Sequence, residues 1–92
     1  MGQIVRKAVA GTLESSDALV EIEPGGTLEV ELDSVVETQF GESIRASIRE
    51  VLRERGVNAA RVRVTDRGAL DCVIRARVET AVARGEEAEP LA

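Results

Sequence analysis

The sequence contains no histidine, and this absence excludes the most common kinds of catalytic site. Histidine is the usual general base near neutral pH and the commonest ligand of catalytic metals. Among the 92 residues none can therefore complete a Ser-His-Asp or Cys-His nucleophile. A zinc site would have to be built from one cysteine and carboxylates. We expect no catalytic residue and no metal site here, with any catalytic groups on another polypeptide.

Aromatic residues and cysteine are almost as scarce. Phe40 is the only aromatic side chain, since tryptophan and tyrosine are missing, so the core must be aliphatic and offers little for stacking a base or a flat cofactor. The single cysteine, Cys72, excludes an internal disulfide and fits a reducing compartment. Because its neighbours Leu70, Val73 and Ile74 are apolar, Cys72 is expected to be a buried core residue rather than a reactive thiol.

Excess positive charge and long apolar runs are also missing. With 17 acidic and 12 basic residues, the formal net charge is −5, whereas nucleic-acid binders and proteins that dock on anionic membranes carry basic surfaces. No run approaches the roughly 18 apolar residues that a membrane span needs, and no apolar signal core opens the chain. We therefore expect a cytoplasmic protein that binds neither nucleic acid nor a membrane.

What is present indicates one small domain that begins with three strands. Residues 3–13 are rich in β-branched positions, and residues 18–23 and 27–33 alternate apolar with acidic side chains. Pro24, Gly25 and Gly26 form a strong turn signal, which predicts a hairpin between the second and third strands. Carboxylates recur at every second position of that hairpin, as a solvated strand face requires, so we interpret them as surface groups rather than metal ligands: Glu21, Glu23, Glu29, Glu31 and Asp33.

The second half of the chain predicts two helices and one more strand. A helix is expected from near Gly41 to Gly56, because five apolar residues follow the spacing of one helix face: Phe40, Ile44, Ile48, Val51 and Leu52. Residues 57–65 alternate like a strand. Residues 69–84 fit either a strand or a helix, and their length and alanine content favour the helix. The predicted fold class is α+β: a domain of residues 1–85 with an antiparallel sheet of about four strands, two helices on one face, and an acidic, disordered tail at 86–92.

The segment Glu14-Ser15-Ser16-Asp17 has no apolar anchor and predicts an exposed turn. Serine hydroxyls in turns commonly bond to nearby backbone groups. Alternatively, an exposed hydroxyl is an attachment point for a covalent group, placed there by another enzyme because nothing in the segment would activate it. The residues alone leave both interpretations open. Arg75 and Arg77 are similarly either a docking face or the solvated flank of a helix.

Two longer stretches carry a resemblance to a known family. AGTLESSD spans residues 10–17 and DRGALDCVIRARVE spans residues 66–79, with QFG at 39–41 between them. Together they resemble the gamma subunit of citrate lyase, the acyl carrier protein of that complex, over residues 8–84. The carrier subunit of malonate decarboxylase is a sister family with the same type of prosthetic arm, but the Glu-Ser context and the GALDC stretch favour citrate lyase.

The resemblance implies a non-catalytic carrier with Ser15 as its modified residue. In that family this serine holds 2'-(5''-phosphoribosyl)-3'-dephospho-CoA through a phosphodiester. The motif often continues with Gly-Asp, and because this chain has Ser16 before Asp17, Ser16 is the second choice. Glu14 and Asp17 are expected to repel the anionic arm and keep it away from the domain.

The same resemblance implies partners. The alpha subunit would exchange the acetyl group on the arm's thiol for citrate, and the beta subunit would cleave the citryl thioester to oxaloacetate. A prosthetic-group transferase and an acetyl ligase would mature the carrier. The alternatives are a carrier of malonate decarboxylase or of a related thioester system, and an unmodified protein-interaction module.

Overall fold

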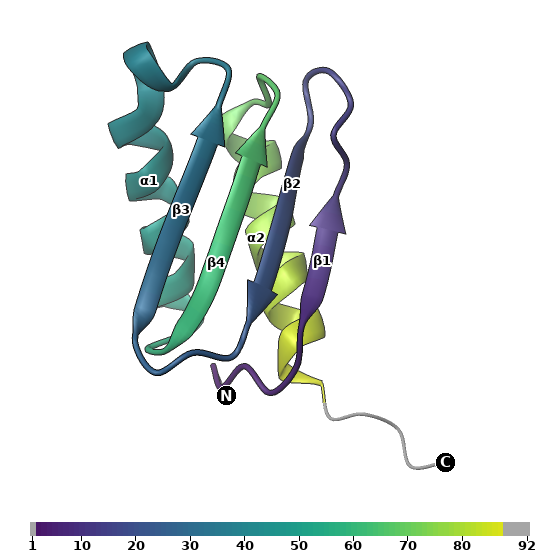
Figure 1. The fold of residues 1–92 in the computed structure, drawn as a ribbon, viewed down its shortest axis with the longest axis vertical. Helices are drawn as coiled ribbons and strands as arrows, with labels where there is room; N and C mark the ends of the chain where they lie inside the picture. Colours follow the sequence, from purple (N-terminus) through teal and green to yellow (C-terminus); the bar gives the residue numbers. More distant parts are fainter. Residues whose placement is uncertain (1, 88–92) are drawn as a thin grey trace.

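The computed structural model describes residues 2–87 as two layers, a four-stranded sheet and two helices that cover one of its faces (Figure 1). The elements follow the order β1 (Ala8–Gly11), β2 (Ala18–Glu23), β3 (Leu28–Ser34), α1 (Glu37–Glu54), β4 (Ala60–Asp66) and α2 (Asp71–Glu86). This confirms the α+β class and the helical form of the last segment. Within this described part no helix is both long and apolar enough to cross a membrane.

The strand order β1-β2-β4-β3 shows that the predicted hairpin is wrong. β4 lies between the second and third strands, antiparallel to β2 and parallel to β3, so the sheet is mixed rather than antiparallel. Charge explains the arrangement. A hairpin with its apolar side chains on one face would set glutamates of β2 opposite glutamates of β3, which is destabilising. Instead, Arg61 lies opposite Glu23 and Glu29, and Arg63 lies opposite Glu21 and Glu31.

The core lies between the sheet and the helices and is aliphatic, as the composition requires. Val62 and Val64 of the central strand β4 are fully buried, as are Ile48, Leu52 and Val78 of the helices. Each such side chain contributes about 1.5–3 kcal/mol on burial. The apolar residues of β3 are only half-buried because this strand forms an edge of the sheet. Helix packing against the inner strands therefore holds the domain together.

Two side chains are more exposed than the sequence predicted. α1 begins at Glu37 rather than near Gly41, and its first turn extends past the end of β3 (Figure 1), so Phe40 is not covered by the sheet. Cys72 is exposed because it is the second residue of α2, two positions before the buried stripe that starts at Ile74. The exposure of Cys72 contradicts the prediction that it is a buried core residue.

The ends of the elements also differ from the sequence-based bounds. β1 covers only Ala8–Gly11 of the predicted residues 3–13, and β4 continues to Asp66. The predicted tail starts inside the last turn of α2, where Glu86 is the final helical residue. The rest of that tail, residues 88–92, lies outside the described residues.

Three connections lie together at one end of the sheet, as Figure 1 shows. They are the β1–β2 loop at residues 12–17, the β3–α1 link at residues 35–36 and the β4–α2 loop at residues 67–70. The parallel strands β3 and β4 both end here and β2 begins here. The predicted serine turn therefore lies at the same end of the sheet as the β3–α1 and β4–α2 connections.

Candidate functional site

Residues 14–17 form a tight, exposed turn, as predicted. The amide of Asp17 donates to the carbonyl oxygen of Glu14 at 3.1 Å, which leaves Ser15 and Ser16 at the two central positions, both exposed. Ser16 has a φ of 66°, in the left-handed region that favours glycine. A glycine at position 16, as in the motif that the resemblance implies, would adopt this conformation without strain.

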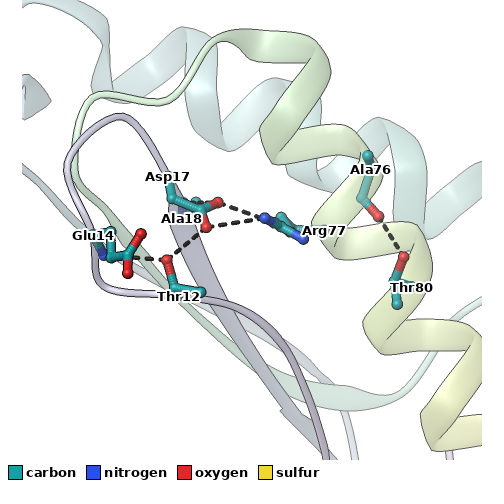
Figure 2. Close-up of polar contacts among 7 residues, drawn as sticks. All are labelled: Thr12, Glu14, Asp17, Ala18, Ala76, Arg77 and Thr80. Carbon is teal, nitrogen blue, oxygen red and sulfur yellow. Dashed lines mark hydrogen bonds and ion pairs between the residues drawn. The ribbon is translucent and has the colours of Figure 1, made fainter.

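The turn is anchored to α2 by an ion pair between Asp17 and Arg77, drawn in Figure 2. Arg77 donates from Nε to Oδ1 at 3.0 Å and from Nη2 to Oδ2 at 2.9 Å. Thr12 Oγ1 donates to Oδ2 at 2.6 Å and the amide of Ala18 to Oδ1 at 2.7 Å. These bonds, Arg77 first, hold the pKa of Asp17 well below its usual range. Asp17 is therefore bound as a carboxylate within the domain.

This anchoring corrects one electrostatic expectation. Asp17 does not present a free charge beside the serines, because Arg77 neutralises it. Glu14 is the acidic neighbour that stays exposed, and within residues 2–87 it makes no ion pair. Any repulsion of an anionic group at the turn therefore comes from Glu14.

Gly11 and Thr12 shape the same loop. Gly11 has a φ of 98°, and a Cβ added there would lie 1.8 Å from the carbonyl oxygen of Ala18 and 3.2 Å from Cδ of Arg77. Thr12 Oγ1 also accepts from the amide of Glu14 at 3.2 Å. The Gly-Thr part of the motif therefore folds the loop, while Leu13, Glu14 and Ser15 are directed outward and exposed.

The β4–α2 loop supports the turn from its other side. The amide of Ser16 donates to the carbonyl oxygen of Arg67 at 2.9 Å. The amide of Arg67 in turn donates to the carbonyl oxygen of Asp17 at 2.9 Å. Asp66, which is 1% exposed, accepts from Ser34 Oγ at 2.8 Å and from the amides of Gly68 and Ala69 at 3.2 and 2.9 Å. The turn therefore rests on a loop that is itself fixed by a buried carboxylate.

Sequence reasoning missed Asp66 and Arg77 as supports of the turn. An aspartate two residues before a glycine is a signal for a loop in which the carboxylate bonds to following amides, so Asp66 could have been found. Arg77 gives no such signal, because its partner Asp17 lies 60 positions away. Its role is neither of the two considered, since it fastens a loop rather than forming a docking face or a solvated flank.

Arg75 and the sheet carboxylates have structural roles. Arg75 bonds to Asp71 at 2.8 Å and to Glu50 at 2.7 Å, which joins α2 to α1. The hydroxyl of Ser47, followed by Arg75, lowers the pKa of Asp71. On the open face of the sheet the carboxylates pair with arginines, at 3.2 Å for Arg61–Glu23 and 3.1 Å for Arg63–Glu31. Over residues 2–87 no group of histidine, cysteine or acidic side chains is arranged to hold a metal ion.

The chemistry that the turn offers is that of two exposed hydroxyls. Within the described residues neither serine hydroxyl makes a hydrogen bond, and both are exposed. The nearest anchored carboxylate, that of Asp17, already accepts four hydrogen bonds, so it is poorly suited to take a serine proton. The turn presents an accessible hydroxyl on a backbone that is fixed at both sides.

Comparisons with known proteins first show the class of protein. Residues 5–85 match the acyl carrier family model described as "Malonate decarboxylase delta subunit (MdcD)". A chain of a Pseudomonas malonate decarboxylase hetero-tetramer, crystallised in complex with malonate, has the same fold with a TM-score of 0.78 and 23% identity, over 90% of this chain and 88% of that one. The fold and the matched residues are those of a small carrier domain.

Curated relatives identify the family of carrier proteins to which the chain belongs. The citrate lyase acyl carrier protein of Haemophilus influenzae (strain PittEE) is 53% identical over 92% of this chain and 90% of its own length. The protein of the same name from Cronobacter sakazakii is 51% identical over 97% of this chain and 93% of its own length. That from Treponema denticola is 51% identical over 92% of this chain and 98% of its own length. The chain belongs to the family of citrate lyase acyl carrier proteins, as the resemblance indicated.

Proposed function

We propose that this chain is the acyl carrier subunit of a citrate lyase and that Ser15 carries 2'-(5''-phosphoribosyl)-3'-dephospho-CoA through a phosphodiester. The observation that carries the proposal is the exposed Ser15 hydroxyl, at the corner of a turn held by the Asp17–Arg77 ion pair. The names and the 51–53% identity of the relatives support the citrate lyase assignment. When bound, the group supplies a terminal thiol that holds the acyl group as a thioester.

The residues of the chain suit such a group. The Ser15 hydroxyl is accessible to a transferase and is not occupied by a hydrogen bond within the described residues. Ser16 is the less suitable of the two, because its own amide is bonded to Arg67 and its backbone is held in the left-handed region. Anchoring on both sides keeps the attachment point fixed relative to the domain, so motion is left to the attached group.

The contribution of the domain is tethering. A group fixed to one protein that visits two active sites acts at a high effective concentration at both. In this proposal the alpha subunit exchanges the acyl group and the beta subunit cleaves citrate to oxaloacetate, in the cytoplasm. A transferase and an acetyl ligase mature the carrier. The absence of histidine is in keeping with catalysis by those other chains.

Mass spectrometry of chain produced together with its maturation enzymes tests the proposal. The wild type should gain the mass of one prosthetic group, and peptide mapping should locate it at Ser15. The Ser15→Ala variant should keep the bare mass, whereas Ser16→Ala and the control Ser43→Ala, which is exposed on α1, should be modified. Bare wild type under these conditions refutes the proposal and supports an unmodified interaction module, and modification of Ser15→Ala moves the site to another residue.

The description of the matching family model favours a second candidate, the carrier of a malonate decarboxylase. Reconstitution separates the two functions. The modified chain should restore citrate cleavage to carrier-free alpha and beta subunits of citrate lyase, and it should not restore decarboxylation to carrier-free malonate decarboxylase. The reverse result would replace the first assignment with the second.

A further inference from the structure

Among residues 2–87, most of the exposed large apolar side chains lie at the end of the domain that carries Ser15. Four of the six such residues are found there: Leu13 at 53%, Val35 at 62%, Phe40 at 53% and Leu70 at 71% exposed. The other two, Val5 and Val9, belong to β1 and the segment before it. Single exposed apolar residues are ordinary, but several at the end of the domain that carries a functional point indicate an interaction surface. We call these four residues the apolar end patch.

Contacts link the segments that carry the patch. The amide of Val35 donates to the carbonyl oxygen of Asp66 at 3.2 Å, and Cγ2 of Val35 lies 3.9 Å from the position of a Cβ on Gly68, two residues before Leu70. The amide of Ser16 bonds to Arg67 in the same loop, which joins the serine turn and Leu13 to this region. Figure 1 shows the three connections and the start of α1 at one end of the sheet. The patch and Ser15 therefore share one end of the domain.

The polar residues beside the patch are mainly acidic. Glu14, Asp33 and Glu42 are exposed and make no ion pair within the described residues. Of the basic side chains described at this end, Arg67 is the one that is likewise exposed and without an ion pair. The other acidic groups here are neutralised, with Asp17 held by Arg77, Glu37 by Arg45 and Asp71 by Arg75. A surface that fits this end therefore has an apolar centre and lysine or arginine around it.

We propose that the apolar end patch is the surface by which this domain docks on the acyl-transferring subunit of its complex, at a site that is apolar with a basic rim. This inference rests on the proposed function. Leu13 lies two residues before Ser15, and the loop that carries Leu70 is bonded to the serine turn, so a subunit that receives the attached group meets this end of the domain. A second copy of the chain is disfavoured as the occupant, because two acidic rims would face each other.

Leu70 offers a clean test, because it is the N-cap residue of α2 and its side chain makes no capping bond. Serine is among the best N-cap residues, so Leu70→Ser removes the apolar side chain while favouring the helix. We expect Leu70→Ser to bind the purified alpha subunit about tenfold more weakly, as removal of a central interface side chain does. Val9→Ser, at an exposed valine of β1 outside the patch, should change the affinity less than about twofold.

A charge pair tests the rim. Glu14→Lys should slow association at low salt and lose this effect at high salt, whereas Glu79→Lys, exposed on α2, should not. Affinities are measured by calorimetry and association rates by surface plasmon resonance, on chains that also carry Ser15→Ala, so that no attached group contributes. This separates the docking surface from the attachment site, because the proposed function is judged by mass and reconstitution instead.

Each result of these binding measurements either supports or overturns the docking surface. Weaker binding by Leu70→Ser with normal binding by Val9→Ser supports the docking surface. Equal affinities for wild type and Leu70→Ser, or an equal loss with Val9→Ser, overturn it even if Ser15 is modified. Failure of the unmodified chain to bind the alpha subunit overturns it too. A dimer in sedimentation that Leu70→Ser dissociates would instead assign the patch to self-association.

Discussion

Replacement of Ser16 by glycine should stabilise this domain, although it removes a side chain. Among the described residues other than glycine, only Ser16 has a positive φ, at 66°. The left-handed conformation costs a residue with a Cβ about 1–2 kcal/mol, and glycine adopts it without that cost. Glycine also raises the entropy of the unfolded chain, which opposes folding by roughly 0.5–1 kcal/mol. The net expected gain is about 0.5–1 kcal/mol.

Thermal unfolding monitored by circular dichroism measures this gain. For a domain of this size 1 kcal/mol corresponds to about 4–8 °C, so Ser16→Gly should raise Tm by roughly 2–8 °C. Ser15→Gly is the matched control, because it changes the same residue type one position earlier where φ is not positive. That variant relieves no strain and still raises the entropy of the unfolded chain, so its Tm should fall by a few degrees.

The Tm changes of the two variants should have opposite signs, because φ is positive at position 16 and not at position 15. A fall in Tm for Ser16→Gly, or a rise of equal size for both variants, would show that the turn does not hold position 16 in the left-handed region. The same Ser16→Gly chain should still be modified when it is produced with its maturation enzymes, since it keeps Ser15 and has the Gly-Asp order that the resemblance implies.

Three other perturbations test the anchoring and the core. The pKa of Asp17 is lower in the folded than in the unfolded chain, so the stability that it contributes is complete above about pH 5, declines as the pH falls below about 4, and is lost as the pH falls through the lower folded-state pKa. The hydrogen-exchange protection factor of the Ser16 amide should therefore fall in strong acid, and it should already be low at neutral pH in Arg77→Gln. Gly11→Ala should cost at least about 2 kcal/mol in urea unfolding, because the new Cβ would lie 1.8 Å from a carbonyl oxygen, and a cost under 1 kcal/mol would contradict the loop geometry. Leu52→Ala, in the fully buried core, should lose about 2–5 kcal/mol with an unchanged m-value, and a smaller loss would mean that the core is looser than described.

Local patterns predicted the elements of this fold well, and the pairing of its strands poorly. Alternation located β2 and β4, and the apolar stripe located α1, because each pattern depends on neighbours in the sequence. The turn signal at Pro24, Gly25 and Gly26 is real, but the chain then passes the end of β4 before β3 begins. A signal for this was present, since two arginines on one strand match glutamates on two others.

The candidate site, too, was predictable from the sequence only in part. Composition and spacing predicted the exposed turn, and the family resemblance singled out Ser15, whose modification stays a prediction. The anchoring by Arg77 could not be predicted, because it depends on how α2 lies across the sheet. The apolar end patch was hidden for a related reason: Phe40 fits the spacing of a buried stripe, and only the length of α1 beyond β3 leaves it exposed.

The central position of β4 has a consequence for how the chain is made. Synthesis proceeds from the N-terminus, yet the strand that joins β2 to β3 ends at Asp66, and α2, which packs against β1 and β2, follows it. A nascent chain that stops before residue 60 has two acidic strands with nothing between them. Because β4 and α2 join strands that are distant in sequence, we expect the domain to fold after nearly all of it has left the ribosome, and the serine turn to acquire its anchors only then.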